Sequence, residues 1–138
     1  MAAFCFIDGV LELKKNESVT AFYALKGTEE FLEDHFKGFP IMPGVLVFEA
    51  LKQAAVLLLA DLEAKGRAFR LVEADDLKFG RFVKPENRLN IFARLLKKEG
   101  SRYFFDGRVD LAGQGSPRNM AGETVRKALT AHFTLEGV

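Results

Sequence analysis

Short strand-like patterns occupy most of the chain, and one long apolar run interrupts them. Segments rich in β-branched and aromatic residues lie at Phe4–Leu13, which Asp8-Gly9 breaks, and at Ser18–Leu25. A polar, helix-prone stretch spans Gly27–Asp34. Further strand-like segments are Phe69–Val83, Arg88–Lys97, Arg102–Leu111 and Thr124–Leu135. Polar and glycine-containing stretches such as Lys97–Ser101 predict turns or loops between them.

The apolar run predicts a helix from Val45 to about Ala64, introduced by Pro43-Gly44 and stopped by Gly66. Between residues 45 and 60 its only polar residues are Glu49, Lys52 and Gln53. A helix that is apolar on nearly all sides needs cover on nearly all sides.

Two strands, one apolar helix and four strands, joined largely by short turns, predict an antiparallel sheet. A curved sheet wrapped around one central helix would cover that helix. The sequence therefore predicts an α+β protein with the hot-dog fold, formed as a single domain by residues 1–138. Sheets of this kind commonly pair edge to edge in dimers.

Composition narrows the classes of function. The 138 residues are 49% hydrophobic and 28% charged, with a net charge of +1, so no strongly basic face for nucleic acid is expected. Cys5 is the only cysteine, so no intramolecular disulfide can form, which fits a reducing cytosol. Its side chain is expected to be buried as a small hydrophobic group. No signal peptide is evident, and the central run Ala54–Ala60 is far below the roughly 20 residues that span a bilayer.

Glu49 is the first candidate for chemistry. Residues three and four apart share a helix face, so Glu49, Lys52 and Gln53 form one narrow polar stripe. The stripe fits an ordinary solvated face. It also fits a carboxylate held in a largely apolar cleft, where burial suits it to acid–base work near neutral pH.

The turn before the helix adds two further groups. His35 is one of only two histidines, and glycines and prolines restrict the backbone between it and the helix. A lone histidine before a turn is more often a surface or packing residue. However, Gly44 lies where the first helical N–H groups lack partners, which is a site for an oxyanion or a polarised carbonyl. Together with Glu49, these groups fit proton transfer beside a carbonyl.

The segment resembles the signature of the 3-hydroxyacyl-acyl-carrier-protein dehydratases of the FabZ/FabA type. The pattern His-Phe-x-Gly-x-Pro-x-x-Pro-Gly, followed by a helix with an acidic residue and then Gln, is matched by His35, Phe36, Gly38, Pro40, Pro43, Gly44, Glu49, Ala50 and Gln53. Glutamate at position 49 points to the FabZ branch. Phe6–Leu13 and Asp75–Pro85 also resemble family segments, whereas Lys37 stands where the family usually has proline.

The resemblance implies elimination of water from a (3R)-3-hydroxyacyl thioester to give a trans-2-enoyl thioester, with no cofactor and no metal. His35 would take the C2 proton, the Gly44 N–H would bind the thioester oxygen, and Glu49 would protonate the departing hydroxyl. Gln53 would orient Glu49 or serve only as polar packing. Phe36, Val45, Gly44 and Gln53 are thus expected beside the substrate.

The resemblance also implies partners. These are an acyl carrier protein with a phosphopantetheine-linked chain, and a second copy of the chain, because the family's histidine and carboxylate meet across a homodimer interface. Relatives often assemble further into trimers of dimers. Candidates for contact with the anionic carrier are Lys78, Arg81, Lys84 and Arg88, although ordinary solvated surface is the favoured interpretation for any single one. A cytoplasmic protein without nucleic-acid or membrane partners is expected.

Two alternatives stay open. A hot-dog acyl thioesterase can use a helix carboxylate with a helix-start N–H, although it does not typically need the pattern around His35. A non-catalytic subunit that binds an acyl chain or its carrier is the other alternative, although His35 and Glu49 are both retained. His132 has no identifiable partner in the sequence and is taken as structural.

Overall fold

The computed structural model describes residues 5–25, 42–62, 68–80, 83, 87–113 and 126–137. It contains six strands and one helix in these ranges. The elements are β1 (Gly9–Lys14), β2 (Ser18–Ala24), α1 (Gly44–Leu62), β3 (Phe69–Phe79), β4 (Asn87–Glu99), β5 (Arg102–Gly113) and β6 (Arg126–Gly137). No helix in the described part of the chain is both long and apolar enough to cross a membrane.

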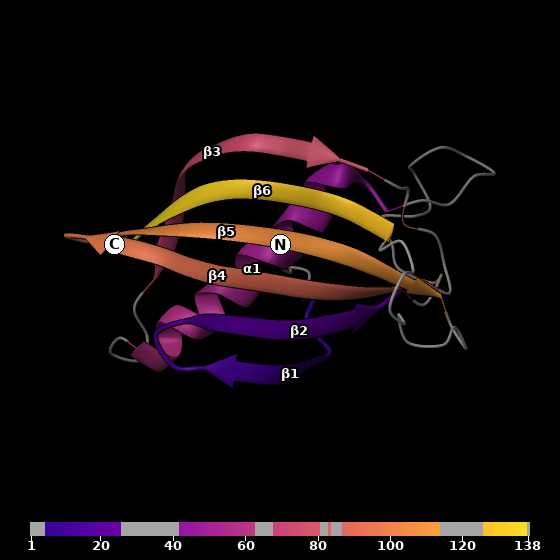
Figure 1. Ribbon diagram of the computed structural model, residues 1–138, viewed down its shortest axis with the longest axis horizontal. Helices are drawn as coiled ribbons and strands as arrows, with labels where there is room; N and C mark the ends of the chain where they lie inside the picture. The colour runs from indigo at the N-terminus through magenta and orange to yellow at the C-terminus, as the bar shows by residue number, and fades with distance from the viewer. Residues whose placement is uncertain are drawn as a thin grey trace.

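The six strands form one antiparallel sheet in the order β1-β2-β4-β5-β6-β3 (Figure 1). The hairpins β1-β2 and β4-β5-β6 pair neighbours in sequence, whereas β3 crosses to the far edge beside β6. Helix α1 lies across one face of the curved sheet and packs on β2, β4, β5 and β6. The predicted α+β hot-dog arrangement is confirmed.

Alternation along the central strands explains which face meets the helix. Leu89, Ile91 and Ala93 of β4 are fully buried, and the residues between them are half-buried on the opposite face. From the helix, Phe48 packs edge-on against Phe133 of β6, which stacks on Phe105 of β5 with ring centroids 5.3 Å apart. Such aromatic pairs contribute about 0.5–1.5 kcal/mol each beyond the area they bury.

A glycine brings the helix close to the sheet. A Cβ atom at Gly107 of β5 would lie 2.7 Å from Cδ1 of Leu51, whose side chain is fully buried. Because Leu51 has no solvent-exposed space to enter, a larger residue at position 107 would push α1 away from the sheet. Cover of the helix is incomplete at two positions, since Val45 is 70% exposed and Leu57 is 37% exposed.

The element bounds correct several expectations. The first regular strand begins at Gly9, at the break predicted at Asp8-Gly9, and Asp8 still contacts β2 through its main-chain N–H to Phe22 and through its side chain, which accepts from the Ala24 N–H at 2.8 Å. β3 stops at Phe79, and Val83 forms only an isolated bridge with Met42. The expected turn at 97–101 shrinks to Gly100-Ser101, with Gly100 at φ 63°. The Gly27–Asp34 stretch lies outside the described residues.

Cys5 corrects another expectation. It is exposed rather than buried, and its Sγ lies 3.6 Å from the carbonyl oxygen of Ile7. The neighbouring Phe6 takes the buried position instead, with 1% of its surface exposed. Successive side chains of an extended segment point to opposite sides, so burial of Phe6 turns Cys5 outward.

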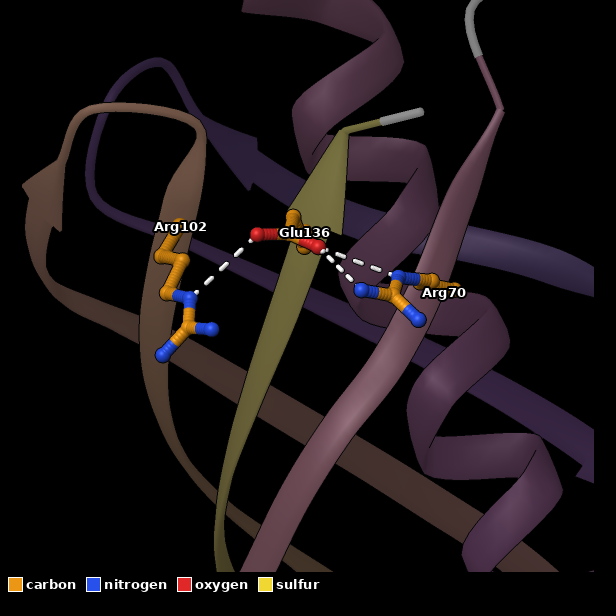
Figure 2. Close-up of polar contacts among 3 residues, drawn as sticks. All are labelled: Arg70, Arg102 and Glu136. Atoms are coloured by element: carbon orange, nitrogen blue, oxygen red, sulfur yellow. Dashed lines mark hydrogen bonds and ion pairs between the residues drawn. The ribbon is translucent and has the colours of Figure 1, made fainter.

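A carboxylate between two arginines ties β3 to the sheet at the end where β3 begins. Glu136 of β6 accepts hydrogen bonds from Arg70 of β3, at 2.6 and 3.0 Å, and from Arg102 of β5, at 3.3 Å (Figure 2). Arg70 first, and then Arg102, hold the pKa of Glu136 below its ordinary value of 4.5. This charge group links the edge strand β3 to its neighbour β6 and, through Glu136, to β5.

We expect this group to make stability depend on pH in the acidic range. A carboxyl whose pKa is lowered in the folded state stabilises the fold above its unfolded pKa, and this contribution disappears as pH falls through the folded pKa. The unfolding temperature of wild type should therefore lie above that of Glu136→Gln at neutral pH. The difference between the two temperatures should narrow as pH falls below 4.5. A gap that is equal at every pH would contradict the assignment.

Candidate active site

The start of α1 is held in place by the segment that follows β3. The N–H of Met42 donates to the carbonyl oxygen of Val83 at 2.8 Å. The Pro43 carbonyl then accepts from the N–H groups of Leu46 and Val47, at 2.9 and 3.1 Å, which makes Pro43 the residue that begins the helical hydrogen-bonding pattern. The N–H groups of Gly44 and Val45 precede the first intrahelical donors, so they have no partner within the helix.

Gly44 fits closely under an aromatic ring. A Cβ atom at this position would lie 2.8 Å from the ring of Phe79, at the end of β3. Because glycine lacks that atom, the ring of Phe79 can lie against the helix start. The ring is 55% exposed, so the helix start and the end of the edge strand meet at the surface. Partial positive charge from the helix dipole gathers at this point.

Glu49 lies at the centre of a hydrogen-bonded group one turn further along α1. The Gln53 Nε2 donates to Glu49 Oε2 at 3.1 Å, and the Lys52 Nζ lies 3.7 Å from Oε1. The Gln53 Oε1 accepts from the main-chain N–H of Phe6 at 2.7 Å. The predicted polar stripe is therefore a connected group, and its Glu49 side chain is 38% exposed.

The structure brings some of the predicted site residues together. Val45, Glu49 and Gln53 follow at spacings of four, which places them on one face of α1, the helix that begins at Gly44. His35 and Phe36 lie outside the described residues, as do Arg81 and Lys84. Phe6 was not predicted as a site residue. Its contact with Gln53 joins residues 47 positions apart and leaves no periodic pattern in the sequence.

The basic candidates have different surroundings. Arg88 of β4 lies with its guanidinium 4.2 Å from the ring centroid of Phe22, and its Nε is buried without a hydrogen-bond partner among the described residues. Lys78 of β3 is exposed. Of these two, Arg88 packs mainly as part of the outer sheet face, so Lys78 is the better placed to contact an external anion.

His132 has partners that the sequence did not reveal. Its Nδ1 lies 3.0 Å from Asp76 Oδ2 of β3, and its Nε2 lies 3.4 Å from Asp106 Oδ1 of β5. Strand register explains the grouping, because Asp106 and Asp75 are the residues opposite His132 on its two neighbouring strands. Its neighbours along β6, Ala131 and Phe133, are buried, so His132 lies on the face away from α1. The structural role expected of His132 agrees with these contacts.

Comparison with known proteins identifies the family. The profile of the ApeI-like family, described as ApeI dehydratase, matches residues 12–114. A 3-hydroxyacyl-[acyl-carrier-protein] dehydratase FabZ from Oceanobacillus iheyensis is 36% identical over 98 residues, covering 70% of each chain. The FabZ of Nitratiruptor is 32% identical over 133 residues, which cover 91% of this chain and 86% of the relative.

Solved structures agree on the fold. The dehydratase heterocomplex ApeI:P from Xenorhabdus doucetiae has a chain that aligns with a TM-score of 0.71 at 14% identity, covering 96% of this chain and 82% of that one. A variant of the fluoroacetyl-CoA-specific thioesterase FlK aligns with a TM-score of 0.67 at 11% identity, covering 92% of this chain and 89% of that one. At such identities the likeness concerns the fold alone.

In the described residues, the six-stranded antiparallel sheet and the helix packed on it define a protein of the hot-dog fold class. The profile match and the FabZ relatives narrow this class. The chain belongs to the FabZ-type, ApeI-like dehydratase family.

Proposed function

We propose that the protein is a (3R)-3-hydroxyacyl-acyl-carrier-protein dehydratase that forms a trans-2-enoyl thioester. The observation that carries this proposal is the Glu49–Gln53 group, which holds a carboxylate about one turn from the helix-start N–H groups that have no partner within the helix. An acid and an oxyanion site at that separation suit an elimination next to a thioester carbonyl. The FabZ relatives support the same reaction by name.

Each proposed role follows from the charge that moves during the reaction. His35 removes the C2 proton, and the electron pair passes towards the thioester carbonyl, whose oxygen gains negative charge. The N–H of Gly44 or Val45 stabilises that oxygen. As the enolate collapses to the C2–C3 double bond, the C3 hydroxyl leaves with a proton from Glu49, and water is released. His35 then carries the proton taken from C2, and Glu49 has lost its own proton to the released water, so a proton passes from His35 to Glu49 through solvent before the next turnover.

The proposed substrate arrives on an acyl carrier protein. Val45 and Phe36 would contact the acyl part near Glu49, and Lys78 would meet the negative charge of the carrier or of its phosphopantetheine. No cofactor or metal is required for this elimination. Participation in fatty acid or a related lipid biosynthesis, in the cytoplasm, follows from such a carrier.

A homodimer completes the proposed site. Strand β3 lies at an edge of the sheet and exposes Leu71, Leu77 and Phe79, with 39, 38 and 55% of their surfaces accessible. An unpaired edge strand with apolar side chains favours pairing with another strand. Pairing of two β3 strands would bring a second chain beside the helix start, since Phe79 lies against Gly44. Further assembly into a trimer of dimers is also proposed, and the opposite edge of the sheet of described strands is β1.

The test of the proposed function is a product assay. Purified protein is given a 3-hydroxyacyl thioester on a carrier protein, with short, medium and long acyl chains. We expect enoyl absorbance to grow without release of free thiol. Release of thiol with no enoyl signal would instead identify a thioesterase, and neither signal, with binding of the acylated carrier retained, would identify a binding subunit.

A further inference from the structure

The N-terminal segment before β1 is fixed against β2 by several contacts. The Asp8 N–H donates to the Phe22 carbonyl at 2.8 Å, and the Asp8 Oδ2 accepts from the Ala24 N–H at 2.8 Å. The ring of Phe6, 1% exposed, meets Tyr23 edge-on with centroids 5.5 Å apart. These contacts fix the main chain at Phe6 although it belongs to no strand.

The main-chain N–H of Phe6 determines how the Gln53 amide is oriented. It can only donate, and it lies 2.7 Å from the Gln53 side chain, so the atom facing it must be Oε1. The Nε2 group then faces Glu49 at 3.1 Å. A flipped amide would place donor against donor at Phe6 and acceptor against carboxylate at Glu49, so both hydrogen bonds would be lost.

We infer that the Phe6 main-chain N–H is a positioning group for the acid Glu49, acting through the Gln53 amide. The inference rests on the proposed function for the role of Glu49, but the hydrogen-bond chain itself does not. Because Gln53 donates to Oε2, that oxygen is held as an acceptor, and the carboxyl group of Glu49 keeps a fixed orientation on α1. Gln53 is therefore a positioning residue rather than a contact for the substrate.

A matched pair of variants isolates the N–H. Phe6→Pro and Phe6→Ala both remove the ring, but only proline removes the main-chain donor. We expect kcat of Phe6→Pro to be about tenfold or more below that of Phe6→Ala, with KM within about threefold, because misplacing a catalytic group lowers turnover more than binding. Equal kcat values for two folded variants would overturn the inference.

A second pair keeps the test valid if proline prevents folding. Gln53→Glu retains an acceptor for Phe6 but places a carboxylate oxygen against Glu49, so two carboxylates must share a proton. The limb of the kcat–pH profile that reports loss of the acid's proton should then move to higher pH by about one unit or more. The Gln53→Met variant also removes the hydrogen bond to Glu49 but adds no second carboxylate. It should therefore shift that limb less than Gln53→Glu does. A profile of Gln53→Glu that coincides with that of Gln53→Met would count against the inference.

A spectroscopic measurement separates this inference from the proposed function. The Gln53 side-chain amide protons are followed by ¹H–¹⁵N NMR across the pH range in wild type, Phe6→Ala and Phe6→Pro. We expect a downfield Nε2–H signal that follows ionisation of Glu49 in the first two and is lost in the third. If wild type has no dehydratase activity but the signal behaves so, the proposed function fails and the positioning contact stands. If wild type is active and the signal is the same in all three, the inference fails alone.

Discussion

His35→Ala and Glu49→Gln should each lower kcat for enoyl formation by about 10²–10⁴-fold, the range that a positioned general acid or base contributes. Removing His35 leaves no base for the C2 proton. Glutamine at position 49 keeps the shape of the side chain and can still contact Gln53, but it cannot deliver a proton to the hydroxyl. The loss should therefore appear mainly in kcat, with little change in KM.

The chain provides matched controls for both substitutions. His132→Ala removes the other histidine, which contacts Asp76 and Asp106 on the sheet face away from the helix. Glu99→Gln removes an exposed carboxylate that pairs only with Lys97, at 3.2 Å, among the ion pairs of the described residues. Both controls should keep kcat within about threefold of wild type. If His132→Ala were as inactive as His35→Ala, the assignment of the base would be wrong.

The fold was largely predictable from sequence because its signals are local. The alternation in Ser18–Leu25 and the apolar run from Val45 depend on which side chains face the core, and both elements form within a residue or two of the expected positions. Glu49 and Gln53 could be placed on one helix face for the same reason. The break at Asp8-Gly9 was visible in the sequence, whereas the hydrogen bond from the Ala24 N–H to the Asp8 side chain, sixteen residues away, was not.

Contacts between distant segments could not be predicted in this way. The Phe6 N–H reaches Gln53 across 47 positions, and the pairing of β3 with β6 brings Asp76 to His132 across 56. These contacts depend on the order of strands in the sheet, which short-range periodicity does not determine. The positioning group of the site therefore became visible only in three dimensions, whereas the motif that contains Glu49 was visible in the sequence.

A mixed dimer of two inactive variants should regain activity. If His35 and Glu49 meet across the dimer interface, an isolated heterodimer of His35→Ala with Glu49→Gln contains one intact site and one site that lacks both groups. We expect about half of the wild-type kcat per dimer, because a two-fold interface forms two equivalent sites from both chains. The starting homodimers have no intact site, so the gain is large against a background near zero.

The position of β3 explains why a shared site is expected. Its outer edge has no strand partner among the described residues, and its last residue, Phe79, lies against Gly44 at the start of α1. A partner strand on that edge brings the partner chain next to the N–H groups and towards Glu49 on the same helix. The ring of Phe79 thus connects β3 directly to the helix start that forms the proposed oxyanion site.

The heterodimer is prepared with two different affinity tags and isolated after co-expression, so that both chains are present in every molecule assayed. A heterodimer of two differently tagged His35→Ala chains is the matched control and should stay inactive. If the mixed dimer is equally inactive while its mass confirms the dimer, then His35 and Glu49 act within one chain. In that case β3 pairing could still form the dimer, but it would not complete the site, and each subunit would hold its own base and acid.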